Sequence, residues 1–357
     1  MIRKNARFGA AFAVGVLLLA ACGSDEPTST PTPEATDAAA ETPATGAPSS
    51  ADLSVFKDKT VGVISLAPGL EPVDRITAGV EQCVTDNGGK VQVFDAKGGT
   101  EAVPAFEQAN GAGVDAIYNV ANDVSGGSLD AALAEAATAK RPVITAWAGQ
   151  RSGTYSITGL EFQSAARVGQ YVIDRIAAEN DGAAAGTVLV VNARVTPSLR
   201  QRADAFTAMV GPDTEFPDIE VETVEVDVAN ALADAQAKVE QAIQANPDIN
   251  AIYASFDTIG QGAAAAVDAA GGSQFVVSFN GDSTALDMIR AGGSFAATAA
   301  NDLEGTATLA CDLFAQLLSG STPSATTYWM DSPLVTAKNV PASGFATAPG
   351  AFQLYVP

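Results

Sequence analysis

The feature that most constrains the fold is a regular alternation of short apolar runs and longer helical segments that begins near residue 60. The first runs are nearly continuous in apolar character, as in strands of a parallel sheet that helices cover on both faces. After the first run, Ile76, Val80, Cys83 and Val84 form one stripe of an amphipathic helix that ends at a Gly-Gly pair. Strands are predicted at 60–65, 91–96, 116–121 and 142–148, and helices at 101–111 and 126–140.

A second series of the same kind follows residues 156–161 and opens with a helix that runs to about residue 180. The natural interpretation is α/β, with two doubly wound parallel-sheet (Rossmann-like) domains in tandem. Because ligands bind at the carboxyl ends of strands in such sheets, two facing domains predict a ligand cleft between them. Further strands are predicted at 187–193, 221–227, 249–256, 274–281 and 294–301.

The N-terminus predicts a signal peptide over residues 1–21, since a basic start precedes an apolar run too short to span a membrane. The string LAAC at 19–22 resembles the lipobox of bacterial lipoproteins, which implies that Cys22 carries a lipid. Residues 22–57 are dominated at first by Thr, Pro, Ala, Ser and acidic residues. Such a composition buries too little surface to offset its ordering entropy, so we expect a disordered tether there.

Composition excludes several classes of function. The formal net charge of −22 argues against nucleic acid or an anionic lipid surface as a partner of the folded part. The chain has no histidine, which removes His-dependent nucleophiles, general bases and metal sites. We therefore expect a binding protein with no catalytic residue, metal or cofactor. A hydrolase that uses carboxylates alone stays open, because Asp74, Asp257 and Asp282 lie near predicted strand ends.

In order along the chain stand the phrases KTVGVISLAPGLEPVDRITAGVEQ, GVDAIYNVAND, RPVITAWAG, RQRADAF, NPDINAIYASFDTIGQGAAAAVDAAG and FVVSFNGDSTALDMIRAGGSFAATAAND. Together they resemble the type I periplasmic binding proteins, and specifically the ribose-type sugar-binding components of ABC importers, from about Lys59 to Leu318. The resemblance implies a three-segment hinge between an N-terminal and a C-terminal ligand-binding subdomain. Their implied bounds are 58–160 plus 302–325 and 161–301 plus 326–357.

The resemblance also places Cys83 and Cys311 on helices of the N-terminal subdomain. An exported protein can keep a disulfide, so we hypothesise a Cys83–Cys311 bond. Two unpaired buried cysteines are the alternative, since each lies on an apolar stripe.

Ligand-contacting positions are implied one by one. Carboxylates that grip sugar hydroxyls in the family are replaced by Trp147 and Asn280, and an aromatic ring appears at Phe256. These changes predict a flatter or less hydroxylated ligand than a free pentose. Both rings could alternatively be hydrophobic core. The implied contacts are Asp74, Arg75, Asn119, Trp147, Arg200 with Arg202 as its neighbour, Phe256, Asn280 and Asn301.

The sequence therefore predicts a membrane-anchored solute-binding protein of an ABC importer that closes two domains on a small sugar, polyol or nucleoside-like molecule. Its expected partners are that ligand, an ABC permease and a membrane reached only through the lipid anchor. We expect a monomer outside the cytoplasm, anchored to the outer face of the cell membrane. The alternative is a sensing module that presents its closed form to a receptor or sensor kinase.

Overall fold

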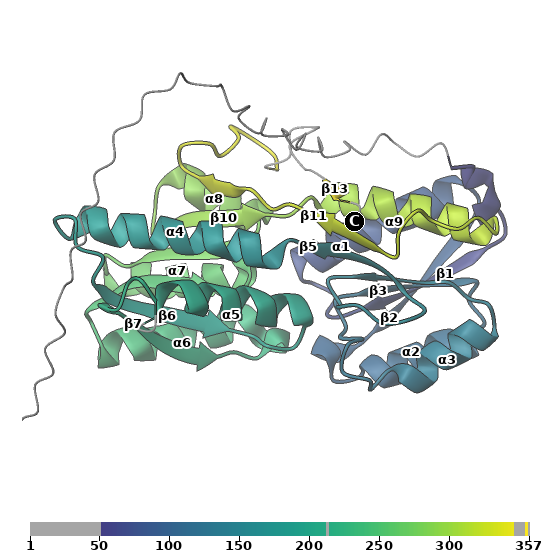
Figure 1. Cartoon of the computed structure of the whole chain (residues 1–357), viewed down its shortest axis with the longest axis horizontal. Coiled ribbons are helices and arrows are strands. Elements are labelled where there is room, and N and C mark those ends of the chain that lie inside the picture. Colours follow the sequence, from purple (N-terminus) through teal and green to yellow (C-terminus); the bar gives the residue numbers. More distant parts are fainter. Residues whose placement is uncertain (1–50, 212–213, 346–353, 356–357) are drawn as a thin grey trace, which may run out of the picture. The chain divides into compact units, whose positions relative to one another are not determined.

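Figure 1 shows the computed structural model of the chain, which describes residues 51–211, 214–345 and 354–355. The described residues all belong to one compact unit. The predicted signal peptide, Cys22 and the tether as far as residue 50 lie outside the described residues.

The first lobe is built on a sheet with the strand order β13-β11-β5-β4-β3-β1-β2. Its pairs are parallel except for β11 with β13. Helices α1 (Glu71–Asp86) and α9 (Leu303–Leu318) cover one face, and α2 (Ala102–Gly111) and α3 (Asp130–Thr138) cover the other (Figure 1). The strands, with one short 3-10 helix, are β1 (Thr60–Ser65), β2 (Lys90–Asp95), β3 (Ala116–Val120), β4 (Val143–Ala146), β5 (Tyr155–Gly159), β11 (Thr327–Met330), β13 (Leu354–Tyr355) and η2 (Lys97–Gly99).

The second lobe has the strand order β12-β10-β9-β8-β6-β7, with β12 as its antiparallel member. One face carries α4 (Glu161–Glu179) and α5 (Pro197–Val210), and the other carries α6 (Ala231–Ala245), α7 (Asp257–Ala270) and α8 (Ser283–Ala291). The remaining elements are β6 (Gly186–Asn192), β7 (Ile219–Glu225), β8 (Ile249–Ala254), β9 (Phe275–Asn280), β10 (Phe295–Ala300), β12 (Leu334–Thr336) and η3 (Val228–Asn230).

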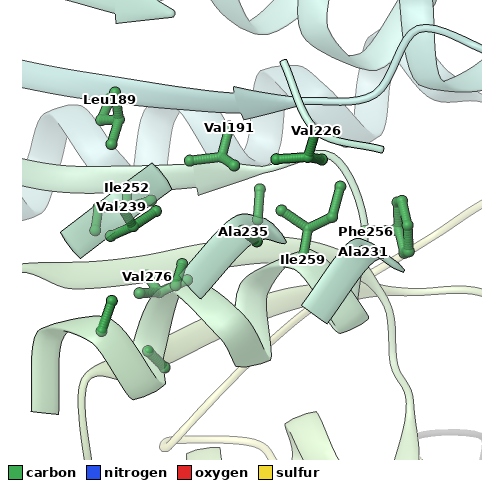
Figure 2. Packing of buried hydrophobic residues seen from close by; sticks show 14 of the residues in the cluster. Leu189, Val191, Val226, Ala231, Ala235, Val239, Ile252, Phe256, Ile259 and Val276 are labelled. Carbon is green, nitrogen blue, oxygen red and sulfur yellow. The ribbon is translucent and has the colours of Figure 1, made fainter. Parts of the chain in front are cut away.

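Successive residues of the central strands face opposite helical layers, which is why their runs are apolar throughout. In β1, Val63 packs in the cluster with α1 and α9, whereas Ile64 packs with α2 and α3. In β6, Leu189 packs with α6 and α7 (Figure 2), whereas Val190 packs with α4 and α5. These clusters confirm the predicted α/β class with parallel-dominated sheets covered on both faces.

The edge strands depart from this pattern. We predicted burial on both faces for 91–96, yet β2 lies at the edge of its sheet and Val93 is 46% exposed. β7 is likewise an edge strand with mostly exposed or half-buried side chains. The expectation was wrong for 91–96 because apolar content alone does not tell an edge strand from a central one.

The predicted tether extends too far toward the fold. Leu53–Phe56 form a 3-10 helix, η1, and Phe56 is fully buried in the cluster with α1 and α9. Asp52 caps η1 by accepting a hydrogen bond from the Ser54 backbone nitrogen at 3.0 Å. The ordered fold therefore begins before residue 57, because Phe56 packs inside this cluster and Leu53 and Val55 pack against it.

The C-terminal boundary at residue 326 also needs correction. β11 pairs in parallel with β5 of the first sheet, so Thr327–Met330 belong to the first lobe. The chain then crosses to β12 in the second sheet, and β13 pairs with β11 in the first. The other two crossings lie at Leu160, between β5 and α4, and at Asn301–Asp302, between β10 and α9.

A disulfide joins Cys83 of α1 to Cys311 of α9 in the structure, with the two Cα atoms 6.5 Å apart. It links two helices that share one face of the first sheet. Within the described residues, no helix has both the length and the apolar character needed to cross a membrane.

Candidate functional site

A cavity of about 60 Å³ lies where the carboxyl ends of the strands of the two lobes meet. The first lobe contributes Leu66 after β1, Ala121 after β3 and Trp147 after β4. The second lobe contributes Phe256 after β8 and Asn280 at the end of β9. The volume is far below the roughly 300–1,000 Å³ of typical small-molecule pockets, so the lobes must separate to admit a ligand.

Three cavity residues at strand ends have backbone conformations that side chains rarely adopt. The φ angles are 63° at Ala121, 51° at Trp147 and 118° at Asn280. Non-glycine residues with positive φ carry a cost of order 1–3 kcal/mol and persist where the surroundings hold them. These three residues reach the cavity from three different strands, whereas Asp58, Lys97, Lys140 and Asp181, which also have positive φ, do not line it.

Trp147 and Phe256 are both core and cavity residues. Trp147 is 8% exposed and packs in the cluster of α1 and α9, and its indole nitrogen has no hydrogen-bond partner among the described residues. Phe256 is 4% exposed and packs beside Ile259 and Ala231 (Figure 2). Each ring therefore lines the cavity and also packs in a hydrophobic core cluster.

The N-terminus of α5 closes the cavity from the second lobe. Thr196 caps the helix by accepting a hydrogen bond from the Leu199 backbone nitrogen at 3.2 Å, and Pro197 fills its first turn. The Ser198 hydroxyl donates to the backbone oxygen of Trp147 at 3.3 Å, which ties α5 to the first lobe. Thr196, Ser198 and Leu199 all line the cavity.

Arg202 is the centre of a buried polar network at the cavity. Its Nε donates to Glu161 Oε2 at 2.5 Å and its Nη2 donates to Glu161 Oε1 at 3.3 Å. Its Nη1 donates to Asn280 Oδ1 at 3.1 Å, and Asn301 Nδ2 donates to the same oxygen at 3.0 Å. The Asn301 Oδ1 accepts from the Ser332 hydroxyl at 2.7 Å. The network thus joins residues beside all three crossings between the lobes.

The structure places the predicted Arg200 outside this cavity. Its Nη2 donates to Asp123 Oδ2 of the first lobe at 2.6 Å, and its Nη1 donates to the Arg194 backbone oxygen. The neighbour Arg202 lines the cavity instead. Two residues along a helix are 200° apart, so one faces the cavity when the other does not. The signal was present, because Arg202 continues the buried stripe of Leu199, Ala203, Phe206 and Val210.

Three further predicted residues do not line the cavity. Asn119 is fully buried and exchanges two hydrogen bonds with Asn122, at 2.8 and 2.9 Å. The Asp74 carboxylate accepts from the Gly69 backbone nitrogen on the surface. Arg75 pairs with Glu304 of α9 at 2.5 Å. The structure thus brings together Trp147, Phe256, Asn280 and Asn301 of the eight predicted contacts.

Hydrogen bonds across the cleft hold the two lobes together. The Glu71 carboxylate of α1 accepts from the Ser283 backbone nitrogen at 2.8 Å and from the Ser283 hydroxyl at 2.6 Å, at the start of α8. The Asp123–Arg200 pair forms a second bridge. The structure therefore shows the two lobes closed on each other, with hydrogen bonds between them both outside the cavity and along its wall.

The carboxylates considered for hydrolysis are not arranged for it. Asp257 is fully buried, and its carboxylate accepts hydrogen bonds from Ser278, Thr298 and the Asp282 backbone nitrogen. Asp282 is fully buried as well, and Asp74 lies on the surface. Since none of the three lines the cavity, no pair of acids flanks a substrate bond there. Nor does the described part of the chain contain a group of three or more His, Cys, Asp or Glu side chains that could hold a metal ion.

Comparison with known proteins gives matches over most of the chain. The family model described as "Periplasmic binding protein domain" matches residues 64–322. Solved structures of the same fold include ABC transporter solute-binding proteins of Agrobacterium vitis, with bound allitol, and Mycobacterium smegmatis, with bound glycerol. The first is 21% identical, with a TM-score of 0.71 over 80% of this chain and 97% of that one. The second is 21% identical, with a TM-score of 0.70 over 82% and 100%. A 5-methylthioribose transporter solute-binding protein of Thermotoga lettingae is also 21% identical, with a TM-score of 0.69 over 79% and 87%.

Proposed function

Because the chain belongs to the type I periplasmic binding protein family, we propose that it captures a sugar, polyol or nucleoside-like ligand in its cleft and delivers it to the permease of an ABC importer. Proteins of this family bind solutes and are not enzymes, which confirms the prediction of a binding protein. The observation that carries the proposal is the cavity at the facing strand ends, walled by side chains from both lobes. The allitol, glycerol and 5-methylthioribose bound by proteins of the same fold support a small polyhydroxylated ligand.

The proposed ligand contacts are Trp147, Phe256, Asn280 and Asn301, with Arg202 added from the structure. Asn119 and Asp74 hydrogen-bond to neighbouring loops, Arg75 joins α1 to α9, and Arg200 acts across the cleft. Binding proceeds by hinge closure, because contacts made by both lobes exist only when the cleft is shut. The ligand therefore shifts the equilibrium toward the closed form by its difference in affinity for the two forms.

Proteins of this family act outside the cytoplasm. We propose that Cys22 carries the lipid that holds the chain on the outer face of the cell membrane, with the residues that follow as a tether. A Cys22→Ala chain should leave the membrane fraction and lose incorporation of labelled fatty acid. A variant that stays membrane-bound without label would show that another segment anchors the chain.

The ligand can be identified by thermal melting of the purified chain in the presence of pentoses, hexoses, polyols and nucleosides. We expect the chain to be a monomer in this assay. A ligand at a hundredfold excess over its Kd stabilises the folded state by about 2.7 kcal/mol, which melting resolves easily. Trp147 and Trp329 are the two tryptophans, so a Trp329→Phe background isolates the emission of the cavity ring. Melting shifts without any change in Trp147 emission would place the ligand elsewhere. Light scattering of the same sample tests the monomer.

A further inference from the structure

Arg202 is the single charged residue among the described residues that line the cavity, and it is 3% exposed. A buried guanidinium is a strong ligand for carboxylate and phosphate groups when nothing else satisfies it. Its surroundings therefore decide whether this cleft takes anions.

Glu161 cancels that charge at close range. It is 2% exposed and meets the guanidinium through both carboxylate oxygens, at 2.5 and 3.3 Å. The neighbouring Gly159 makes room for it, because a Cβ there would lie 2.7 Å from Glu161 Oε1. Nη1 of Arg202 is also occupied, by Asn280 Oδ1 and by the Ser255 backbone oxygen. The positive charge of Arg202 in the cavity wall is consequently neutralised by Glu161.

The rest of the wall offers hydrogen-bond donors and apolar surface. The Trp147 indole nitrogen is buried without a partner in the described structure, so it is free to donate to a neutral ring or hydroxyl oxygen. The apolar part of the cavity wall includes Leu66, Leu70, Val73, Ile76 and Val228. A fully hydroxylated ligand would leave hydroxyls unmet against these side chains.

We propose that the Glu161–Arg202 pair makes this cleft select uncharged ligands with one apolar face, such as deoxy or alkyl-substituted sugars, and reject sugar acids and sugar phosphates. The inference rests on the proposed function and names its ligand class. Glu161 acts as a specificity residue through Arg202 and does not itself line the cavity.

The test compares the full chain with Glu161→Gln in calorimetric titrations against matched series that differ at one carbon. The gluco and galacto series each supply a 6-deoxyhexose, the hexose and the hexuronate, and ribose 5-phosphate is set against ribose and 5-deoxyribose. The wild type should bind a deoxy sugar at least tenfold more tightly than its acid or phosphate partner. In Glu161→Gln this order should reverse, since Arg202 is then uncompensated. The control is Glu179→Gln, which breaks an ion pair with Arg175 elsewhere on α4 and should keep the wild-type order.

Because Glu161→Gln leaves a buried charge and can unfold the chain, the double variant Glu161→Gln/Arg202→Met serves as a second arm. It has no charge at the site and also lacks the Arg202 contact, so it should bind every sugar more weakly than wild type while still binding the deoxy sugar more tightly than its acid or phosphate partner. Anion binding by the double variant, or by the wild type at the affinity of the neutral sugar, would overturn the proposal while leaving solute binding intact. Failure of the wild type to bind any member of any series would overturn it together with the sugar ligand of the proposed function.

Discussion

Asp282 carries a carboxyl group that is fully buried, and neither of its oxygens has a hydrogen-bond partner among the described residues. Burial raises its pKa well above the ordinary value, and the nearby Asp257 and Glu71 raise it further, whereas Arg75 and Arg202 act in the opposite direction. Burial also raises the pKa of Asp257, to about 7. Both carboxyls are therefore easier to protonate in the folded chain than in the unfolded one.

The linked prediction is that Asp282→Asn flattens the pH dependence of stability. Unfolded aspartates titrate near pH 3.9, so the folded chain binds more protons from about pH 4 up to the raised pKa values of these two carboxyls, of which that of Asp257 is about 7, and it loses stability as pH rises through that window. The variant should melt a few degrees higher than wild type at pH 8 and close to it at pH 4.5, since about 1 kcal/mol corresponds to roughly 2–4 °C. Melting curves across this range measure it, with the exposed Asp268→Asn as control. Parallel profiles for wild type and Asp282→Asn would count against the linkage.

Single residues also mark the limit of what the sequence predicts about the site. The family resemblance implied Trp147, Phe256, Asn280 and Asn301 as cleft residues, and all four line the cavity. Each of them follows or ends a strand. Arg200 was predicted as the ligand contact and Arg202 only as its neighbour. Which of the two arginines faces the cavity depends on the position of the buried stripe around α5, and Arg202 lies on that stripe. Nothing in the sequence spacing linked Glu161 to Arg202, because they lie on different helices.

At the scale of elements, α6 and α7 pack so closely that a glycine is required between them. A Cβ at Gly262 would overlap the Leu232 backbone oxygen and lie 3.0 Å from the Gln236 backbone nitrogen. Gly262→Ala should therefore lower the free energy of unfolding by about 1–3 kcal/mol, the usual cost of overpacking. The matched control is Gly111→Ala at the end of α2, where nothing lies within 4 Å of the added atom and the change should be neutral or stabilising. Equal urea midpoints for the two variants would refute the packing argument.

The α1–α9 disulfide supplies a second prediction at this scale. Thiol labelling of the unreduced, denatured protein should leave Cys83 and Cys311 unmodified, and labelling after reduction should modify both. Cys83→Ala, Cys311→Ala and the double variant should each lose about 2–4 kcal/mol, because each removes the same bond and the effects do not add. Labelling of both residues without reduction would support the alternative of two unpaired buried cysteines.

Elements were predicted best where the pattern is local. The strand expected at 294–301 differs from β10 by one residue at each end. β11 and β12 were missed because each is short and pairs with strands far away in the sequence. The lobe to which each of these strands belongs depends on its pairing with distant strands, and the local sequence pattern gives no information about that pairing.

At the scale of the whole molecule, the closed form is stabilised by contacts between the two lobes that lie outside the ligand cavity. Glu71 lies on α1 of the first lobe, and Ser283 lies in the first turn of α8 of the second. An anionic side chain at a helix N-terminus is stabilised there by free backbone N–H groups. Glu71 does not line the cavity, so its effect on binding must act through the equilibrium between open and closed forms.

Glu71→Ala should therefore weaken ligand binding without removing a ligand contact. If the bridge stabilises the closed form by about 0.5–1.5 kcal/mol, the Kd rises roughly 2- to 10-fold. The rise should appear mainly as faster dissociation, and small-angle scattering of the unliganded variant should show a larger radius of gyration than wild type. Glu81→Ala, an exposed change on the same helix, should alter neither quantity. An unchanged Kd in Glu71→Ala would mean that the cavity wall and the Asp123–Arg200 bridge suffice to hold the lobes closed.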